Sequence, residues 1–357
     1  MKNIAARSLL NLKLNFPRNF PRTLSLNCFP ALRFDHLIWI LMSSMLAAFF
    51  NVASAQSPAW PVKPIKLVAV FPPGGSVDQV ARVISQPLQV LLGQPVFVDN
   101  KGGASGSIGT AAVAKSEPDG YTFAVVFDTH GVNPSLIPNL SYDTKKDLLP
   151  VMLISRSAMM VAAHPSTGFK NFLEVVAASK KDPGKYAFAS IGSGSLAHLA
   201  LTQLQNQGNF QLTHVPYKGG GPALQDAVGG QVPLIAGTVF LISPQVDGKN
   251  LVPLAVTSAK RIAKYPDVKT MAEQGFPGYE SVAWWGVFAP AKTPPAIIAA
   301  MNAALTKVLS EPAVRDRLTA QGMEIVASKP DELGKFLDIE IDRWAKVIKD
   351  NKIKAGE

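Results

Sequence analysis

The feature that most constrains the fold of this chain is a regular alternation of strand-like and helix-like segments joined by glycine-rich turns. Residues 65–71 (IKLVAVF) are rich in branched apolar side chains, which is typical of a buried strand. Residues 78–92 carry apolar side chains at helical spacing and are followed by Gly93, a common residue at the end of a helix. Because strands and helices continue to alternate, the sequence predicts an α/β fold.

The first glycine-rich junction, residues 72–75 (PPGG), joins these two elements, and two further junctions follow predicted strands downstream. The strand at 186–191 leads into residues 192–195 (GSGS), and the strand at 212–217 leads into residues 218–222 (KGGGP). The adjacent Trp284 and Trp285 are predicted to belong to the core rather than to a ligand surface. The other predicted elements are strands at 96–98, 121–127, 159–164 and 251–256, and helices over 169–181, 196–206, 222–228, 293–309 and 331–348.

The N-terminal residues 1–55 have the pattern of a secretory signal peptide. Residues 37–50 (LIWILMSSMLAAFF) form an uncharged apolar run, and the small residues 53–55 (ASA) then provide a cleavage site after Ala55. An uncleaved membrane anchor is the alternative, although 14 apolar residues are few for a bilayer span. The sequence therefore predicts export from the cytoplasm.

Without this segment the chain carries 29 basic and 24 acidic residues, a net charge of +5, and has no clustered basic stripe. This balance suits small anionic ligands and argues against nucleic acid as a partner. The single cysteine, Cys28, lies in the predicted signal segment, so the mature chain has no disulfide and no thiolate. The four mature histidines fall at no metal-ligand spacing, so neither a metal nor a cofactor is predicted.

Each glycine-rich junction predicts a helix N-terminus that a ligand can approach closely. The first backbone N–H groups of a helix are unpaired and attract anions. A simple connection is an equally good interpretation of any one junction, but three together favour a binding role. The residues Ser76 and Gln79 fit a capping box in which Ser76 caps the helix. Asp78 either completes the first turn of that helix or contacts the ligand, and both alternatives stay open.

Enzymatic alternatives have less support in the sequence. Residues 192–197 (GSGSLA) match a dinucleotide fingerprint, but no acidic residue follows about twenty positions on. A hydrolase could use a serine of this loop with His198, yet the chain has neither a nucleophile elbow nor an accompanying acid–base pair. The sequence therefore predicts a protein that is not an enzyme.

Several long motifs, in order, resemble the tripartite tricarboxylate transporter substrate-binding proteins, also called the Bug family. They cover nearly all of the mature chain and include FPPGGSVDQVAR, VFVDNKGGASGSIGTAAVAKSEPDGYTF, YAFASIGSGSLAHLA, HVPYKGGGPALQDAVGGQV and WWGVFAPAKTP. The resemblance implies a monomeric two-domain periplasmic binding protein of the Venus-flytrap type with crossing hinge strands. Such a receptor captures a small carboxylate and delivers it to the transporter's membrane subunits. A ligand sensor that acts through a partner receptor is an alternative that the sequence does not separate from it.

The resemblance also implies domain limits and a site. Residues 56–159 with 283–357 form the first domain, residues 160–282 form the second, and loops 73–76 and 192–195 face each other across the cleft. Residues 128–130 and 233–238 depart from the family pattern, which leaves the identity of the ligand open. The predicted ligand-binding residues are Pro73, Gly74, Gly75, Ser76, Asp78, Thr129, His130, Ser190, Gly192, Ser193, Gly194, Ser195, His198, Tyr217 and Lys218.

Overall fold

One long strand, β4 (Leu148–Ala163), organises the whole structure. The computed structural model describes residues 60–353, so the predicted signal segment lies outside the described residues. The strand order is β2-β1-β3-β9-β4-β7-β5-β6, and both β8 and β10 also pair with β4. The other strands are β1 (Ile65–Ala69), β2 (Val96–Asn100), β3 (Thr122–Phe127), β5 (Ala187–Ser190), β6 (Thr213–Pro216), β7 (Leu234–Thr238), β8 (Val252–Val256), β9 (Val282–Pro290) and β10 (Glu324–Ile325).

The strand β4 belongs to two sheets because it changes partners along its length. Its first part pairs antiparallel with β9 as far as Ala158, opposite Val282. From Met159 onward it pairs with β7 and β8. We call residues 60–158 and 282–353 the first lobe and residues 159–281 the second lobe. We propose domain limits near 159/160 and 282/283, as the sequence predicts, because this change of partner falls beside them.

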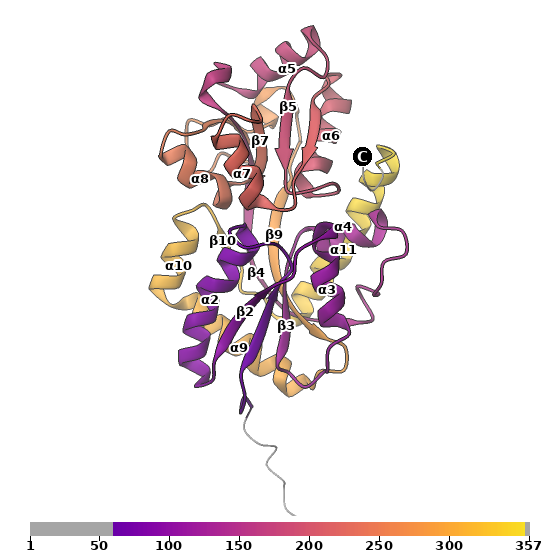
Figure 1. Ribbon diagram of the computed structural model, residues 1–357, viewed down its shortest axis with the longest axis vertical. Coiled ribbons are helices and arrows are strands. Elements are labelled where there is room, and N and C mark those ends of the chain that lie inside the picture. Colours follow the sequence, from indigo (N-terminus) through magenta and orange to yellow (C-terminus); the bar gives the residue numbers. More distant parts are fainter. Residues whose placement is uncertain (1–59, 354–357) are drawn as a thin grey trace, which may run out of the picture. The chain divides into compact units, whose positions relative to one another are not determined.

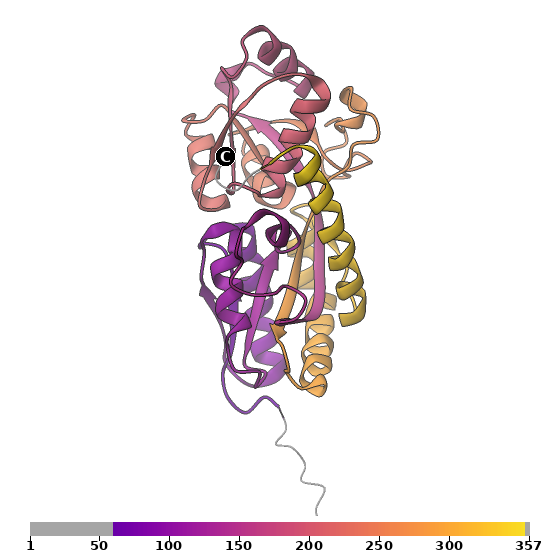
Figure 2. The same cartoon turned by 90° about the vertical axis from the view of Figure 1, so that its right-hand side faces the viewer.

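Helices cover both sheets and confirm the α/β alternation (Figure 1). The helix α2 packs against α9 and β2, while α11 packs against α4 and β4 in the first lobe and also contacts α6 of the second lobe (Figure 2). The helices are α2 (Ser76–Leu92), α3 (Ser107–Ala114), α4 (Thr129–Leu136), α5 (Phe172–Lys181), α6 (Leu196–Gly208), α7 (Gly220–Val228), α8 (Val239–Asp247), α9 (Pro295–Ser310), α10 (Pro312–Thr319) and α11 (Pro330–Asp350), with 3₁₀ turns η1 (Ala104–Gly106), η2 (Pro165–Thr167) and η3 (Ala272–Gln274).

The two tryptophans of β9 are core residues, as predicted. Trp284 and Trp285 are fully buried, and the ring of Trp285 lies 5.0 Å from that of Phe127 at the end of β3. Burying such large side chains on a hinge strand contributes several kcal/mol, on the order of 3–5 per ring by the cost of truncation. The hinge is therefore held by packing as well as by strand pairing.

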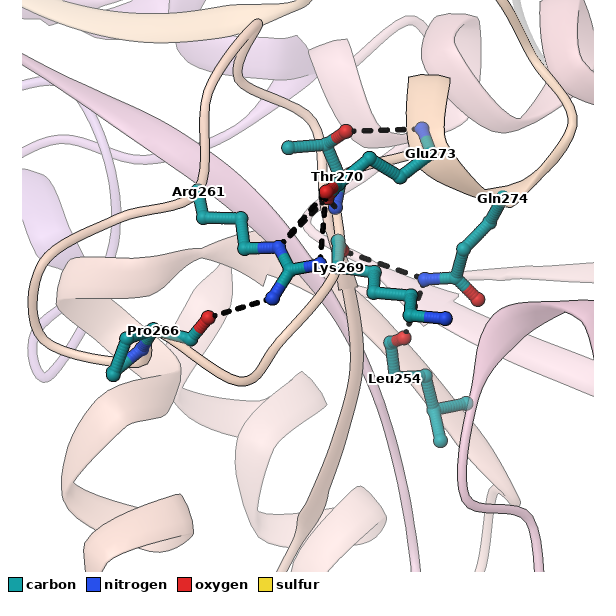
Figure 3. A network of polar contacts seen from close by, with 7 residues as sticks. All are labelled: Leu254, Arg261, Pro266, Lys269, Thr270, Glu273 and Gln274. Atoms are coloured by element: carbon teal, nitrogen blue, oxygen red, sulfur yellow. Dashed lines mark hydrogen bonds and ion pairs between the residues drawn. The ribbon is translucent and has the colours of Figure 1, made fainter.

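The segment between β8 and β9 is fixed to the second lobe by a network of polar contacts (Figure 3). The single Nε–H of Arg261 is shared between the two oxygens of the Glu273 carboxylate, at 3.0 and 2.9 Å. The amide of Gln274 donates to the Leu254 carbonyl of β8 at 2.9 Å and accepts from the Phe172 N–H at the start of α5. These hydrogen bonds therefore hold in place the segment that leads from β8 back to the first lobe.

Two sequence predictions differ from the structure at this level. The strand predicted at 159–164 is only the end of β4, which begins at Leu148. Pro222 is the third residue of α7 rather than the first, because the helix begins at Gly220 with Gly219 as its cap. The glycines at 219–221 allow the chain to turn into the helix at Gly220, two residues before Pro222. The proline is therefore not needed to start the helix.

Candidate functional site

Three helices begin at the wall of one enclosed cavity between the lobes. Ser76 is the first residue of α2, Leu196 and Ala197 begin α6, and Thr238 caps α8. Their first backbone N–H groups and the positive ends of their dipoles favour an anion there. We call this space the inner cavity, and its lining residues are Ser76, Phe127, Met159, Ile191, Leu196, Ala197, Ala236, Gly237, Thr238 and Leu241.

A second and larger cavity of about 360 Å³ lies beside it, also between the lobes. Ile191 lines both cavities, so the two spaces adjoin at this side chain. We call this space the outer cavity, and its lining residues are Phe71, Gly103, Ala104, Ser105, Leu136, Ile137, Ile191, Gly192, Ser193, Pro216, Tyr217 and Lys218.

The start of α2 differs from the capping box that the sequence predicts. Gly75, in an extended conformation, is the N-cap, and Ser76 makes no side-chain capping bond. The side chain of Gln79 donates instead to the Gly74 carbonyl at 3.1 Å. A glycine satisfies the extended geometry of the cap without a side chain, so the Ser76 hydroxyl lines the inner cavity rather than capping its own helix.

The carboxylate of Asp78 braces the loop that precedes α2. Its Oδ2 accepts the Gly74 N–H at 3.0 Å, and its Oδ1 accepts from Arg82 Nε at 2.8 Å. Burial alone raises the pKa of Asp78, but the bonds from Arg82 and Gly74 outweigh it and hold the pKa below its ordinary value. Asp78 is absent from the lining of both cavities, and a direct contact between Asp78 and the ligand stays a prediction.

The loop before α6 is held by hydroxyl and imidazole groups behind it. Ser195 caps the helix by accepting the His198 N–H at 3.4 Å, and His198 Nδ1 accepts the Gly194 N–H at 3.0 Å. The fully buried Ser190 accepts the Gly192 N–H at 3.2 Å. These bonds fix the direction of the free N–H groups at the start of α6.

The third helix end, at α8, is one that sequence reasoning missed. Thr238 ends β7 and caps α8, and its hydroxyl oxygen accepts the Leu241 N–H at 3.2 Å. That bond uses a lone pair, so the hydroxyl hydrogen stays available to a ligand oxygen. A threonine after an apolar strand and before an apolar helix was the signal, but the segment lacks the glycine pair that marks the other junctions.

The lobes touch each other through the glycine-rich loops themselves. A Cβ on Gly75 would lie 3.7 Å from the Gly220 amide nitrogen, and one on Gly221 would lie 3.3 Å from the Pro73 carbonyl oxygen. The Ser105 hydroxyl also donates across the interface to the Ser193 carbonyl at 2.7 Å. With the lobes in contact, the inner cavity has a free volume of about 10 Å³, which is room for about one water molecule. The structure is therefore a tightly closed form, and a carboxylate, which has three heavy atoms, fits at the helix starts only when the lobes lie slightly further apart.

Thr129 and His130 lie away from both cavities. They begin α4 and are 1% and 2% exposed, and the His130 ring lies 4.6 Å from that of Phe288. Burial lowers the pKa of His130 from 6.5 to about 3, so the imidazole is neutral. Burial and the nearby Glu340 charge raise the pKa of the adjacent Asp128 well above its ordinary value. A ligand role for Thr129 and His130 stays a prediction.

The other predicted residues fall into two groups. Ser76 lines the inner cavity, and Gly192, Ser193, Tyr217 and Lys218 line the outer one. The second group shapes the loops behind these residues, namely Pro73, Gly74, Gly75, Asp78, Ser190, Gly194, Ser195 and His198. Within residues 60–353, no group of three His, Cys, Asp or Glu side chains is arranged to hold a metal ion.

Two lobes joined by crossing strands, with helix N-termini converging between them, define a two-lobed solute-binding protein of the periplasmic type. The fold of the solved periplasmic binding protein BugD matches it with a TM-score of 0.80 at 32% identity, covering 83% of this chain and all of BugD. An R. palustris protein solved with adipate matches with a TM-score of 0.80 at 31% identity, over 83% of this chain and 99% of the other.

Sequence comparison identifies the family. The model for the tripartite tricarboxylate transporter family receptor matches residues 80–353. Protein BugT of Bordetella pertussis is 36% identical over 317 residues, which cover 87% of this chain and 97% of BugT. The chain therefore belongs to the tripartite tricarboxylate transporter receptor family, as its motifs predict, and it is a periplasmic-type solute-binding receptor.

Proposed function

We propose that this receptor works in the periplasm, where it captures a small carboxylate between its lobes and delivers it to the membrane subunits of a tripartite tricarboxylate-type transporter. The observation that carries the proposal is the convergence of the N-termini of α2, α6 and α8 on the inner cavity. The adipate complex of the R. palustris relative supports the same ligand class. The protein performs no catalysis.

A carboxylate suits this cavity because the available groups are hydrogen-bond donors. The backbone N–H groups at the three helix starts are supplemented by the hydroxyls of Ser76 and Thr238. Hydrogen bonds to a charged acceptor are each worth about 1.5–3 kcal/mol net. These donors come from both lobes, so a bound anion stabilises the closed form relative to the open one.

The serine hydrolase alternative is disfavoured by the position of its nucleophile. Ser195 is 1% exposed, and its hydroxyl oxygen is occupied as the cap of α6. Nδ1 of His198 accepts the Gly194 N–H instead of a serine proton. A nucleophile needs access to its substrate, and this serine is buried and serves as a helix cap.

The proposal is tested by ligand-induced stabilisation of residues 56–357. A panel of carboxylates and the matching primary alcohols is added in a buffer without organic acids, and the melting temperature is measured. We expect at least one carboxylate to raise the melting temperature and its alcohol to leave it unchanged, because a ligand that binds only the folded state stabilises it by mass action. Equal stabilisation by the alcohols, or none by any carboxylate, would contradict the proposal.

Removing single hydroxyls gives a second test. We expect Thr238→Val and Ser76→Ala each to weaken the binding of that carboxylate by about 1–3 kcal/mol, measured by calorimetry. Ser179→Ala is the matched control, because Ser179 is fully buried but its hydroxyl donates to the Val175 carbonyl within α5. Equal affinities in all three variants would show that the hydroxyls of the inner cavity do not bind the ligand.

A further inference from the structure

We propose that the ligand is a monocarboxylate with an unsubstituted apolar body, alkyl or aryl, and that a second carboxylate on that body weakens binding. The inference rests on the proposed function, because it takes the inner cavity as the place of the first carboxylate. It adds the chemical class of the rest of the ligand, which we infer from the side chains that line the two cavities.

The inner cavity has donors for one carboxylate only. Each helix N-terminus is equivalent to roughly half a positive charge, so three of them offset one negative charge and fall short of two. Ser76 and Thr238 provide the only side-chain hydroxyls among its ten lining residues, and none of the ten is charged. The remaining wall is apolar apart from Gly237, and consists of Phe127, Met159, Ile191, Leu196, Ala197, Ala236 and Leu241.

The outer cavity continues this apolar wall. The side chain of Ile191 lines both cavities, so we place the ligand body that extends from the inner cavity against it. A carboxylate placed against the apolar side chains of this wall loses its water without gaining a partner there, which is strongly unfavourable. The lining also includes the hydroxyl of Ser105, which already donates to the Ser193 carbonyl, and the hydroxyl of Ser193. Apolar side chains there are Phe71, Ala104, Leu136, Ile137, Ile191 and Pro216.

Lys218 is the one cation among the residues that line either cavity, and it does not provide a second anion site. Lys218 is exposed, and an ion pair of an exposed lysine is worth about 0–1 kcal/mol. The neighbouring Tyr217 hydroxyl already donates to Asp226 at 2.7 Å. Lys218 and Tyr217 therefore do not compensate for the free energy lost when a second carboxylate on the ligand body gives up its water.

Matched pairs of acids test the inference directly. Hexanoate and adipate share six carbons and differ in the second carboxylate, as do benzoate and terephthalate with their common ring. We expect the monocarboxylate of at least one pair to bind residues 56–357 at least tenfold more tightly than its partner, measured by calorimetry at pH 7.5. Tighter binding of both diacids would overturn the inference, and so would malate if it bound more tightly than both monoacids.

Two lysine variants sharpen this test. Ile137→Lys places a cation on the outer wall and is expected to reduce the preference for the monoacid at least fivefold. Ile339→Lys, on the 65% exposed Ile339 of α11, adds the same charge elsewhere and is expected to leave the preference unchanged. An Ile137→Lys preference equal to that of the Ile339→Lys control would contradict the placement of the ligand body. We also expect Lys218→Met to change the affinities for the monoacid and the diacid of a pair by the same factor. A selective loss of diacid binding in Lys218→Met would assign Lys218 a second carboxylate and overturn the inference.

The outcomes separate this inference from the proposed function. If a diacid or hydroxy acid is the tightest ligand, the receptor still binds a carboxylate and only the inference fails. If no carboxylate binds, both fail together. If hexanol binds as tightly as hexanoate, the ligand body is correctly assigned to the apolar wall, but the carboxylate is wrongly assigned to the helix starts.

Discussion

Gly194 shows how little space separates the lobes at the level of single residues. Its φ is +75°, and a Cβ there would lie 1.7 Å from Leu136 Cδ2 of the first lobe. The glycine-rich loops thus have a role beyond exposing N–H groups, because they let two backbones meet. The sequence leaves open whether Asp78 contacts the ligand. In the structure the Asp78 carboxylate bonds to Gly74 and Arg82 and so holds the loop before α2.

We therefore expect Gly194→Ala to hinder closure. The added methyl group overpacks the interface, at a cost of about 1–3 kcal/mol, and should weaken ligand binding accordingly. Gly74→Ala is the matched control, because Gly74 has a similar φ of +81° but no atom within 4 Å of the added Cβ. Ligand affinity is measured by calorimetry and closure by small-angle scattering. Equal losses in both variants would assign the effect to backbone strain, and failure of Leu136→Ala to restore Gly194→Ala would exclude the clash.

At the level of elements, the helix α11 ties the first lobe together and reaches the second. Trp344 is 1% exposed and donates from Nε1 to Glu340 at 3.0 Å. At the end of the helix, Asn351 accepts a hydrogen bond from Asn206 of α6 at 2.7 Å. The amphipathic spacing at 331–348 predicted this helix, and the structure confirms it as Pro330–Asp350.

Truncating the buried tryptophan of α11 should be strongly destabilising. We expect Trp344→Ala to lower the free energy of unfolding by about 3–5 kcal/mol, since it removes a large buried ring and leaves a cavity. Ile339→Ala on the exposed face of the same helix should change it by less than about 0.5 kcal/mol. Urea unfolding followed by circular dichroism measures both. Similar values for the two variants would mean that α11 does not anchor the lobe.

Elements with a strong periodic pattern were predictable, and those defined by tertiary contacts were not. The helices α2, α9 and α11 follow their apolar spacing closely. The first part of β4 was missed because Pro150 and the polar residues 155–157 interrupt its apolar run, and only pairing with β9 makes it a strand. The site was predicted where glycines mark helix starts. Thr238 and the apolar wall were missed because their positions depend on how the lobes meet.

For the whole molecule, buried titratable groups couple stability to pH. His130 is neutral in the folded chain because burial lowers its pKa from 6.5 to about 3. The unfolded chain binds a proton at this residue below about pH 6.5, whereas the folded chain does so only near pH 3. Since the unfolded state then holds more protons, this residue makes stability fall as the pH is lowered from about 6.5 to about 3.

Replacing this histidine should remove that part of the pH dependence. We expect His130→Phe to lose less stability than the original chain between pH 6.5 and pH 4, because phenylalanine keeps the ring contact with Phe288 but cannot be protonated. Thermal unfolding at a series of pH values gives the comparison. Parallel curves for the two proteins would show that His130 is not the group responsible.

The closed inner cavity also has a kinetic consequence. Because it has room for about one water molecule, no solute can pass between solvent and the helix starts while the lobes touch. Ligand exchange must wait for the strands β4 and β9 to bend. Dissociation can then be no faster than opening, and at high ligand concentration the observed rate of association levels off if opening comes first. The residence time of the solute is thus limited by opening of the hinge, and solute contacts that stabilise the closed form lengthen it.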